Sequence, residues 1–198
     1  MELLDEYLRQ VAGALLALPR HELEAIDEVL WETYARDGTI LVCGNGGSAA
    51  TASHFVCDLA KWTARPGCRR VRALALTDNV PTLTAWSNDQ GYEDVFVEQL
   101  RAHYRPGDTL LTISGSGNSP NVLRATAWAN RMGAPTIGLV GFDGGELART
   151  ARHTLRVENY SMPQIEDVHM ALCHALAVHL GTRIERLVLS PQLLELTA

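Results

Sequence analysis

The sequence predicts a three-layer α/β domain in which helices cover both faces of a parallel sheet. Two observations indicate it: short apolar runs bounded by glycine, proline, aspartate or asparagine, and helical patterns between those runs. A third is the length of 198 residues, enough for one well-buried domain but short for two. We therefore expect a single domain over residues 1–198, with a helical arm at 1–37 and the α/β core with the C-terminal helix at 38–198.

The sequence of the N-terminal arm predicts two helices. Apolar residues recur at helical spacing over residues 2–18 and again over 21–36. Pro19 separates the two helices, and Gly38 ends the second. We expect this arm to pack against the last helix or against another subunit.

In the α/β core, the sequence predicts five strands and a long helix after them. The strands are the apolar runs at residues 39–43, 71–76, 109–113, 136–140 and 154–157. A helical pattern from about 163 to 189 follows them. Parallel sheets bind ligands outside the carboxyl ends of their strands, so the loops that leave those ends are the first candidates for a site.

Composition argues against several classes of protein. The chain has 17 Lys and Arg against 23 Asp and Glu, a net charge of -6 that argues against a general nucleic-acid binder. Acidic residues near the N-terminus argue against a signal peptide. The sequence contains no stretch of about 18 apolar residues, so no membrane span is expected. The four cysteines form no C-x-x-C pair and are interpreted as free thiols of a cytoplasmic protein.

Residues 44–48, the glycine loop, read Gly-Asn-Gly-Gly-Ser and directly follow the first predicted strand. Glycines allow positive φ and close approach to a ligand, and the helix expected from about Ala49 offers free N–H groups and a positive dipole end. The loop lacks a Walker A lysine and the spacing of a dinucleotide site. It favours a phosphate cradle, with a glycine-rich turn as the purely structural alternative.

Residues 114–119, the serine loop, read Ser-Gly-Ser-Gly-Asn-Ser and directly follow the third predicted strand. Ser119 is a strong N-cap candidate, and Pro120 suits the first helical position. Three hydroxyls and the helix-end N–H groups could surround a phosphate without an arginine. Two such loops, each between a strand and a helix, favour a phosphate-bearing small molecule over two ordinary turns.

Four side chains on two predicted helices have the spacing of a metal or acid–base site. His54 and Asp58 are four residues apart, and Glu166 and His174 are eight apart, so each pair shares a helix face. An imidazole and a carboxylate from each helix would make a four-ligand site for zinc or a similar divalent ion. Taken singly, each residue has an ordinary alternative as a packed histidine or a solvated carboxylate.

At these residues the chain resembles the sugar isomerase (SIS) domain family, and within it the phosphoheptose isomerases. The matching segments are GNGGSAA, ALTDN, SNDQGYEDVF, ISGSGNSPNVL, GLVGFDGGEL and IEDVHMALCHAL, which span roughly residues 40–180 in the family's order. The resemblance implies a flavodoxin-like fold and a homotetramer with active sites shared between subunits. It also implies conversion of sedoheptulose 7-phosphate to a heptose 7-phosphate through an enediol.

The resemblance further implies which residues bind the sugar phosphate. Together with Ser48 of the glycine loop, the positions are Asn45, Gly46, Gly47, Asn88, Asp89, Ser114, Gly115, Ser116 and Ser119. The family usually has threonine at the position of Gly115, so this chain keeps the backbone N–H there and loses one hydroxyl.

The resemblance assigns zinc binding and catalysis to His54, Asp58, Glu166 and His174. It implies His174 as the acid and Asp58 or Glu166 as the base. Asp58 replaces a glutamate of the family and is about 1.5 Å shorter, a misplacement large enough to slow a reaction. Glu166 replaces a glutamine and adds a negative charge. The two changes could compensate each other.

Two other functions remain open at the level of sequence. One is a non-catalytic SIS protein that binds a sugar phosphate or associates with a replication initiator, since GFDGGEL resembles that branch as well. The other is isomerisation of a different sugar phosphate, such as an octose phosphate. His174, together with the segment NDQGYEDVF, favours the phosphoheptose isomerase.

Overall fold

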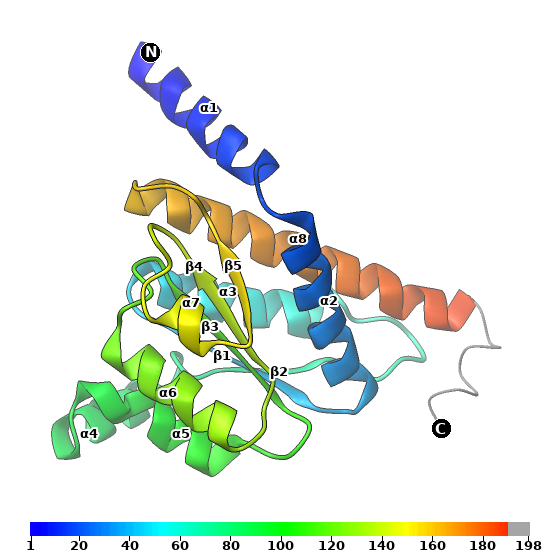
Figure 1. Cartoon of the computed structure of the whole chain (residues 1–198). Helices are drawn as coiled ribbons and strands as arrows, with labels where there is room; N and C mark the ends of the chain where they lie inside the picture. The colour runs from blue at the N-terminus through cyan, green and yellow to red at the C-terminus, as the bar shows by residue number, and fades with distance from the viewer. Residues whose placement is uncertain (190–198) are drawn as a thin grey trace.

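The computed structural model describes residues 1–189 and has five parallel strands at its centre (Figure 1). They are β1 (Thr39–Gly44), β2 (Arg72–Ala75), β3 (Thr109–Ser114), β4 (Thr136–Val140) and β5 (His153–Arg156). Their order, β2-β1-β3-β4-β5, is the flavodoxin-like order. The predicted strands are confirmed to within one residue at each end. The predicted 1–198 domain extends to residues 190–198, which lie outside the described residues, and it stays a prediction.

Helices cover both faces of the sheet (Figure 1). One face carries α2 (Arg20–Ala35), α3 (Gly47–Lys61) and α8 (Met162–Leu189). The other carries α4 (Val80–Asp89), α5 (Val95–His103), α6 (Pro120–Arg131) and α7 (Leu147–Thr150), with the short 3-10 helix η1 (Tyr92–Asp94) before α5. The three layers predicted from the alternating pattern are therefore present.

The alternation of side chains along β1 fills both cores. Ile40 and Val42 pack into the core shared with α2, α3 and α8, whereas Leu41 and Cys43 pack into the core on the opposite face. The neighbouring strands β3 and β4 are buried along their whole length. Such continuous burial is expected of central strands in a parallel sheet covered on both sides.

The N-terminal helix α1 (Glu2–Leu16) extends away from this core and has no buried residue (Figure 1). Two side-chain hydrogen bonds tie it to α8: the Tyr7 hydroxyl donates to Asp167, and the Gln164 amide donates to Gln10, each over 2.6 Å. Pro19 precedes α2, as predicted. Among the described residues, no helix combines the length and apolar character needed to cross a bilayer.

Candidate active site

The glycine loop and the serine loop meet at the switch point of the sheet. The chain leaves β1 toward β2 on one side and later enters β3 on the other, so the loops after β1 and β3 diverge and leave a crevice. Both loops, joined by Met162 and Glu166 of α8, line a cavity of about 240 Å³. The structure thus brings the two predicted phosphate loops into one pocket.

The glycine loop presents unpaired backbone donors to this cavity. Gly46 has φ 54° and ψ -123°, a conformation that side chains disfavour. α3 begins directly after it at Gly47, two residues before the predicted start near Ala49. Within the described part of the chain, the N–H groups of Gly47 and Ser48 have no hydrogen-bond acceptor. They are first-turn donors of a helix and suit an anion.

The serine loop contributes hydroxyls. Ser119 is the N-cap of α6 and Pro120 follows it, as predicted. However, the Ser119 hydroxyl makes no capping hydrogen bond and instead lies 3.4 Å from the Ser114 hydroxyl. Gly117, at φ 64°, closes the turn by donating its N–H to the Ser114 carbonyl over 3.0 Å. The hydroxyls of Ser114 and Ser119 are therefore available to a ligand.

A partly buried amide pair joins the glycine loop to the first turn of α6, directly after the serine loop. Asn45 and Asn121 exchange two hydrogen bonds of 2.9 Å, and the Tyr92 hydroxyl donates to the same Asn45 oxygen over 2.8 Å. Asn121 is only 2% exposed. The sequence analysis missed Asn121 and Tyr92, although both lie in segments that carry the family resemblance. A single amide or phenol has no spacing signal, so only the fold reveals the pairing.

Glu166 lies at the glycine-loop end of the site. A Cβ on Gly47 would be 2.4 Å from each Glu166 carboxylate oxygen, so the carboxylate rests against the first turn of α3. A side chain at residue 47 would therefore displace the Glu166 carboxylate from this position. A carboxylate is favourable at a helix N-terminus. The same charge, however, faces the cavity into which a phosphate would bind.

His54, Asp58 and His174 form a compact cluster between α3 and α8. The two imidazole Nε2 atoms are 2.9 Å apart, and Asp58 Oδ2 is 3.5 Å from each of them. Glu166 is not in this cluster. The Glu166 carboxylate instead packs on α3, about two helical turns before His174, so its role as a fourth ligand stays a prediction.

The two ends of the site lie along one helix pair. α3 and α8 run side by side in the same direction: Glu166 contacts Gly47, and His174 meets His54 seven residues further along α3. Figure 1 shows α8 passing alongside α3. The seam between them therefore connects the phosphate loops to the His–Asp–His cluster.

Asn88 and Asp89 lie outside this pocket. They are exposed at the C-terminal end of α4, where the Asn88 amide donates to Asp89 over 2.9 Å. Neither residue lines the 240 Å³ cavity. Their predicted role in substrate binding is not met within one copy of the chain.

Two groups near the cluster are buried and uncharged. Burial lowers the pKa of His169 to about 4, although its hydrogen bond to the Val140 carbonyl opposes that shift. Burial, and to a lesser extent the Asp58 carboxylate, raises the pKa of the Cys173 thiol. A protonated thiol is a poor metal ligand. Cys173 therefore packs beside Asp58 of the cluster, whereas His169 packs against β4 at Val140.

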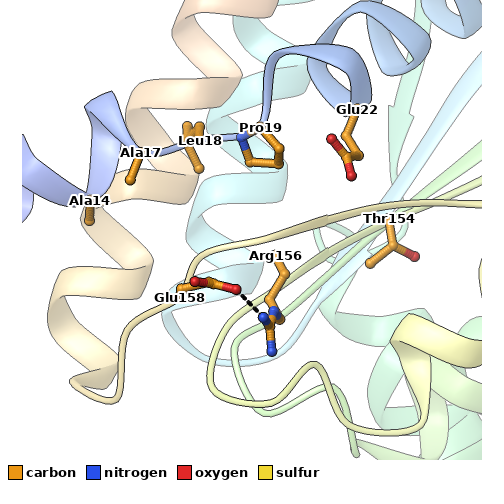
Figure 2. Close-up of a pocket in the computed structure, with 8 residues that line it drawn as sticks. All are labelled: Ala14, Ala17, Leu18, Pro19, Glu22, Thr154, Arg156 and Glu158. Carbon is orange, nitrogen blue, oxygen red and sulfur yellow. Dashed lines mark hydrogen bonds and ion pairs between the residues drawn. The ribbon is translucent and has the colours of Figure 1, made fainter.

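A second cavity of about 360 Å³ lies beneath the junction of α1 and α2 (Figure 2). Figure 2 shows Glu22 and Glu158 among its lining residues, with Arg156 paired to Glu158. An anion entering here would meet two carboxylates and a guanidinium already paired with one of them. This cavity is larger than the loop pocket, but it is unsuited to a phosphate.

Residues 6–141 match the family model described as SIS domain. A phosphoheptose isomerase of Akkermansia muciniphila is 37% identical over 179 residues, covering 86% of this chain and 93% of that protein. One from Rhodospirillum rubrum is 42% identical over 139 residues, covering 70% and 73%. The lincomycin biosynthesis protein LmbN of Streptomyces lincolnensis is 40% identical over 161 residues, covering 76% of this chain but only 58% of that longer protein.

Solved structures agree with these sequence relatives. The phosphoheptose isomerase GmhA from Neisseria gonorrhoeae superposes with a TM-score of 0.83 at 34% identity, covering 91% of this chain and 96% of that one. A phosphoheptose isomerase from Francisella tularensis gives a TM-score of 0.84 at 29% identity, covering 91% and 97%. The match extends over nearly the whole of both proteins.

Proposed function

The chain belongs to the SIS domain family, and on that premise we propose that it is a phosphosugar isomerase that interconverts sedoheptulose 7-phosphate and a heptose 7-phosphate. The observation that carries the proposal is the seam between α3 and α8. It joins a pocket of phosphate-binding loops to a His–Asp–His cluster. The phosphoheptose isomerase relatives cover most of the chain, which supports the same reaction class.

The serine loop is the better of the two anion sites. Its hydroxyls at Ser114, Ser116 and Ser119 line the cavity at the N-terminus of α6. The N-terminus of α3 is instead faced by the Glu166 carboxylate. A phosphate therefore binds at the serine loop, with the Gly47 and Ser48 amides completing its shell from the far side.

The length of the seam suits a seven-carbon sugar. Gly47 and His54 are seven residues apart on α3, about 10 Å at the rise of an α-helix. An extended chain of six C–C bonds with a terminal phosphate ester spans a similar distance of about 10 Å. A sugar anchored by its 7-phosphate thus brings C1 and C2 to the His–Asp–His cluster.

Asp58 and His174 are placed to move protons between C1 and C2 and between their oxygens. An aldose–ketose interconversion needs a base and an acid at adjacent atoms. Asp58 Oδ2 and His174 Nε2 are 3.5 Å apart, which satisfies that requirement. Glu166 is too far along α8 to share those atoms with His174. We assign the base role to Asp58, the acid role to His174, and hydroxyl binding near the phosphate to Glu166.

The same cluster fits a zinc ion. A tetrahedral zinc with bonds of about 2.0–2.1 Å has ligand–ligand edges of about 3.3–3.4 Å. The three donor atoms are separated by 2.9, 3.5 and 3.5 Å, and two imidazoles with a carboxylate are a common catalytic donor set. His54, Asp58 and His174 would hold the ion through these same three atoms, and when bound it would polarise the substrate carbonyl. The acid and base roles given to His174 and Asp58 therefore apply to the cluster without an ion.

The test is turnover of sedoheptulose 7-phosphate, followed by NMR, with chelator-treated protein before and after added zinc. We expect conversion to a heptose 7-phosphate, and an increase when zinc is restored. Absence of conversion under both conditions would reject this substrate. Equal rates with and without zinc would leave His174 as a simple acid and remove the metal from the proposal.

One relative favours a second substrate. LmbN, which is 40% identical over 161 residues, is described as a lincomycin biosynthesis protein. A panel of ketose and aldose phosphates of six to eight carbons therefore belongs in the same assay. Binding of a sugar phosphate without turnover of any member would instead favour a non-catalytic SIS protein.

The complete site requires a second copy of the chain in this proposal. Asn88 and Asp89 lie on the surface, apart from the cavity of their own chain. α1 also exposes apolar side chains at Leu3, Leu4 and Leu8. A homotetramer would cover that helix and deliver the Asn–Asp pair to a neighbouring pocket. Light scattering on the eluting protein gives its mass, and a monomer would contradict the assembly.

A further inference from the structure

Gly115 stands in the middle of the serine loop without a backbone reason to be glycine. Unlike Gly46 and Gly117, its φ lies outside the left-handed region. The space beside it is nevertheless filled, because a Cβ there would lie 2.4 Å from the sulfur of Met162 and 3.2 Å from its terminal methyl carbon. The missing side chain is what admits the thioether.

Met162 is the first residue of α8 and lines the same cavity as the loop hydroxyls. It is 37% exposed, so a bound ligand can bury more of it. A thioether donates no hydrogen bond, and the phosphate donors of this pocket are amides and serine hydroxyls. Its contact with a ligand is therefore with carbon. Three rotatable bonds let methionine adapt to an irregular surface.

We propose that Met162, seated over Gly115, determines specificity by packing against the carbon chain of the bound sugar next to its phosphate. Glu166 lies one turn further along α8 and lines the same cavity, so the helix offers an apolar contact followed by an acceptor for sugar hydroxyls. The inference rests on the proposed function for the identity of the ligand. It adds the residue pair that distinguishes a sugar phosphate from phosphate alone.

The test is a double-mutant cycle of wild type, Gly115→Ala, Met162→Ala and the double variant. KM and kcat are measured with sedoheptulose 7-phosphate, and Kd by calorimetry with that sugar phosphate and with inorganic phosphate. We expect each single change to raise KM and the sugar Kd about tenfold, because each removes the methionine contact. The double variant is no worse than either single one, because both remove the same contact.

Two further results follow from the same proteins. The Kd of inorganic phosphate stays within about twofold of wild type in Met162→Ala, because the thioether does not touch the phosphate. Met132→Ala is the matched control: Met132 is a half-exposed methionine at the C-terminal end of α6, and its removal leaves KM unchanged.

Additive effects of the two changes, unchanged KM in both single variants, or an equal loss of inorganic phosphate affinity would each overturn the inference. Wild-type turnover decides the proposed function separately. If wild type binds sedoheptulose 7-phosphate without converting it, the reaction assigned above is wrong, and the coupling between Gly115 and Met162 is still decided by the sugar Kd values. Wild type that does not bind this sugar rejects both.

Discussion

The partly buried amide pair between the glycine loop and α6 makes Asn121 a critical position for binding, although we do not expect it to touch the substrate. Asn121→Ala removes the two hydrogen bonds of 2.9 Å with Asn45 and the acceptor of the Val122 N–H at 3.0 Å, and it leaves the Asn45 amide without its partner. At about 1 kcal/mol for each bond, with the unpaired amide added, the loss of unfolding free energy is about 2–3 kcal/mol. For a domain of this size the Tm falls by about 5–10 °C. Because the glycine loop is then no longer held by Asn121, we expect KM to rise about tenfold.

Asn130→Ala separates the positional effect from the loss of stability. Asn130 lies on the same helix and has two side-chain hydrogen bonds, to the Thr150 carbonyl over 2.7 Å and from the Thr136 hydroxyl over 2.8 Å. It is remote from the pocket, so its removal lowers Tm by a similar amount and leaves KM unchanged. Thermal unfolding and steady-state kinetics on both variants give the comparison. Equal KM values for the two would refute a role of the amide pair in positioning the loop.

Three more predictions concern charges in and behind the site. Glu166→Gln removes a negative charge from the phosphate pocket and lowers KM about three- to tenfold, whereas a fall in kcat of about 100-fold would identify Glu166 as the base. His174→Ala lowers kcat at least about 100-fold and leaves the sugar phosphate Kd within a few-fold, as calorimetry can verify; unchanged turnover would remove His174 from the mechanism. His169 has a folded pKa of about 4, below its ordinary value of 6.5, so its contribution to stability is complete above pH 6.5 and is lost as the pH falls toward 4, by about 3 kcal/mol. Urea unfolding of wild type and His169→Gln at pH 7.5 and 4.5 measures that difference, and the same pH dependence in both proteins would contradict it.

The fold could be predicted from the sequence because each strand is a short apolar run bounded by turn-forming residues. The run at β4, residues 136–140, is bounded by Pro135 and Gly141 and has the predicted bounds. The start of α3 was misplaced by two residues, because glycines at positions 46 and 47 read as loop. The structure instead uses Gly46 as the N-cap and Gly47 as the first helical residue, where the Glu166 carboxylate needs the space.

The site was readable only in part. His54 and Asp58 share one helix, so their convergence follows from spacing alone, and the approach of His174 follows once α8 packs on α3. The spacing of eight residues between Glu166 and His174 also predicted a shared face. The same spacing also separates the two side chains by about 12 Å along α8, which places them at opposite ends of the seam. Spacing within α8 does not show which residue of α3 each side chain meets, because that depends on how the two helices pack together.

The pairing of α3 with α8 also decides when during folding the site can exist. His54 and His174 are separated by 120 residues, so their contact closes a long loop and is slow to form. On a ribosome, the phosphate loops can be complete while the chemistry is still absent, because the last helix has yet to be made. A sugar phosphate or a zinc ion that bridges the two helices favours the fully docked state by mass action. Binding at this site therefore also reports that α8 has packed against α3.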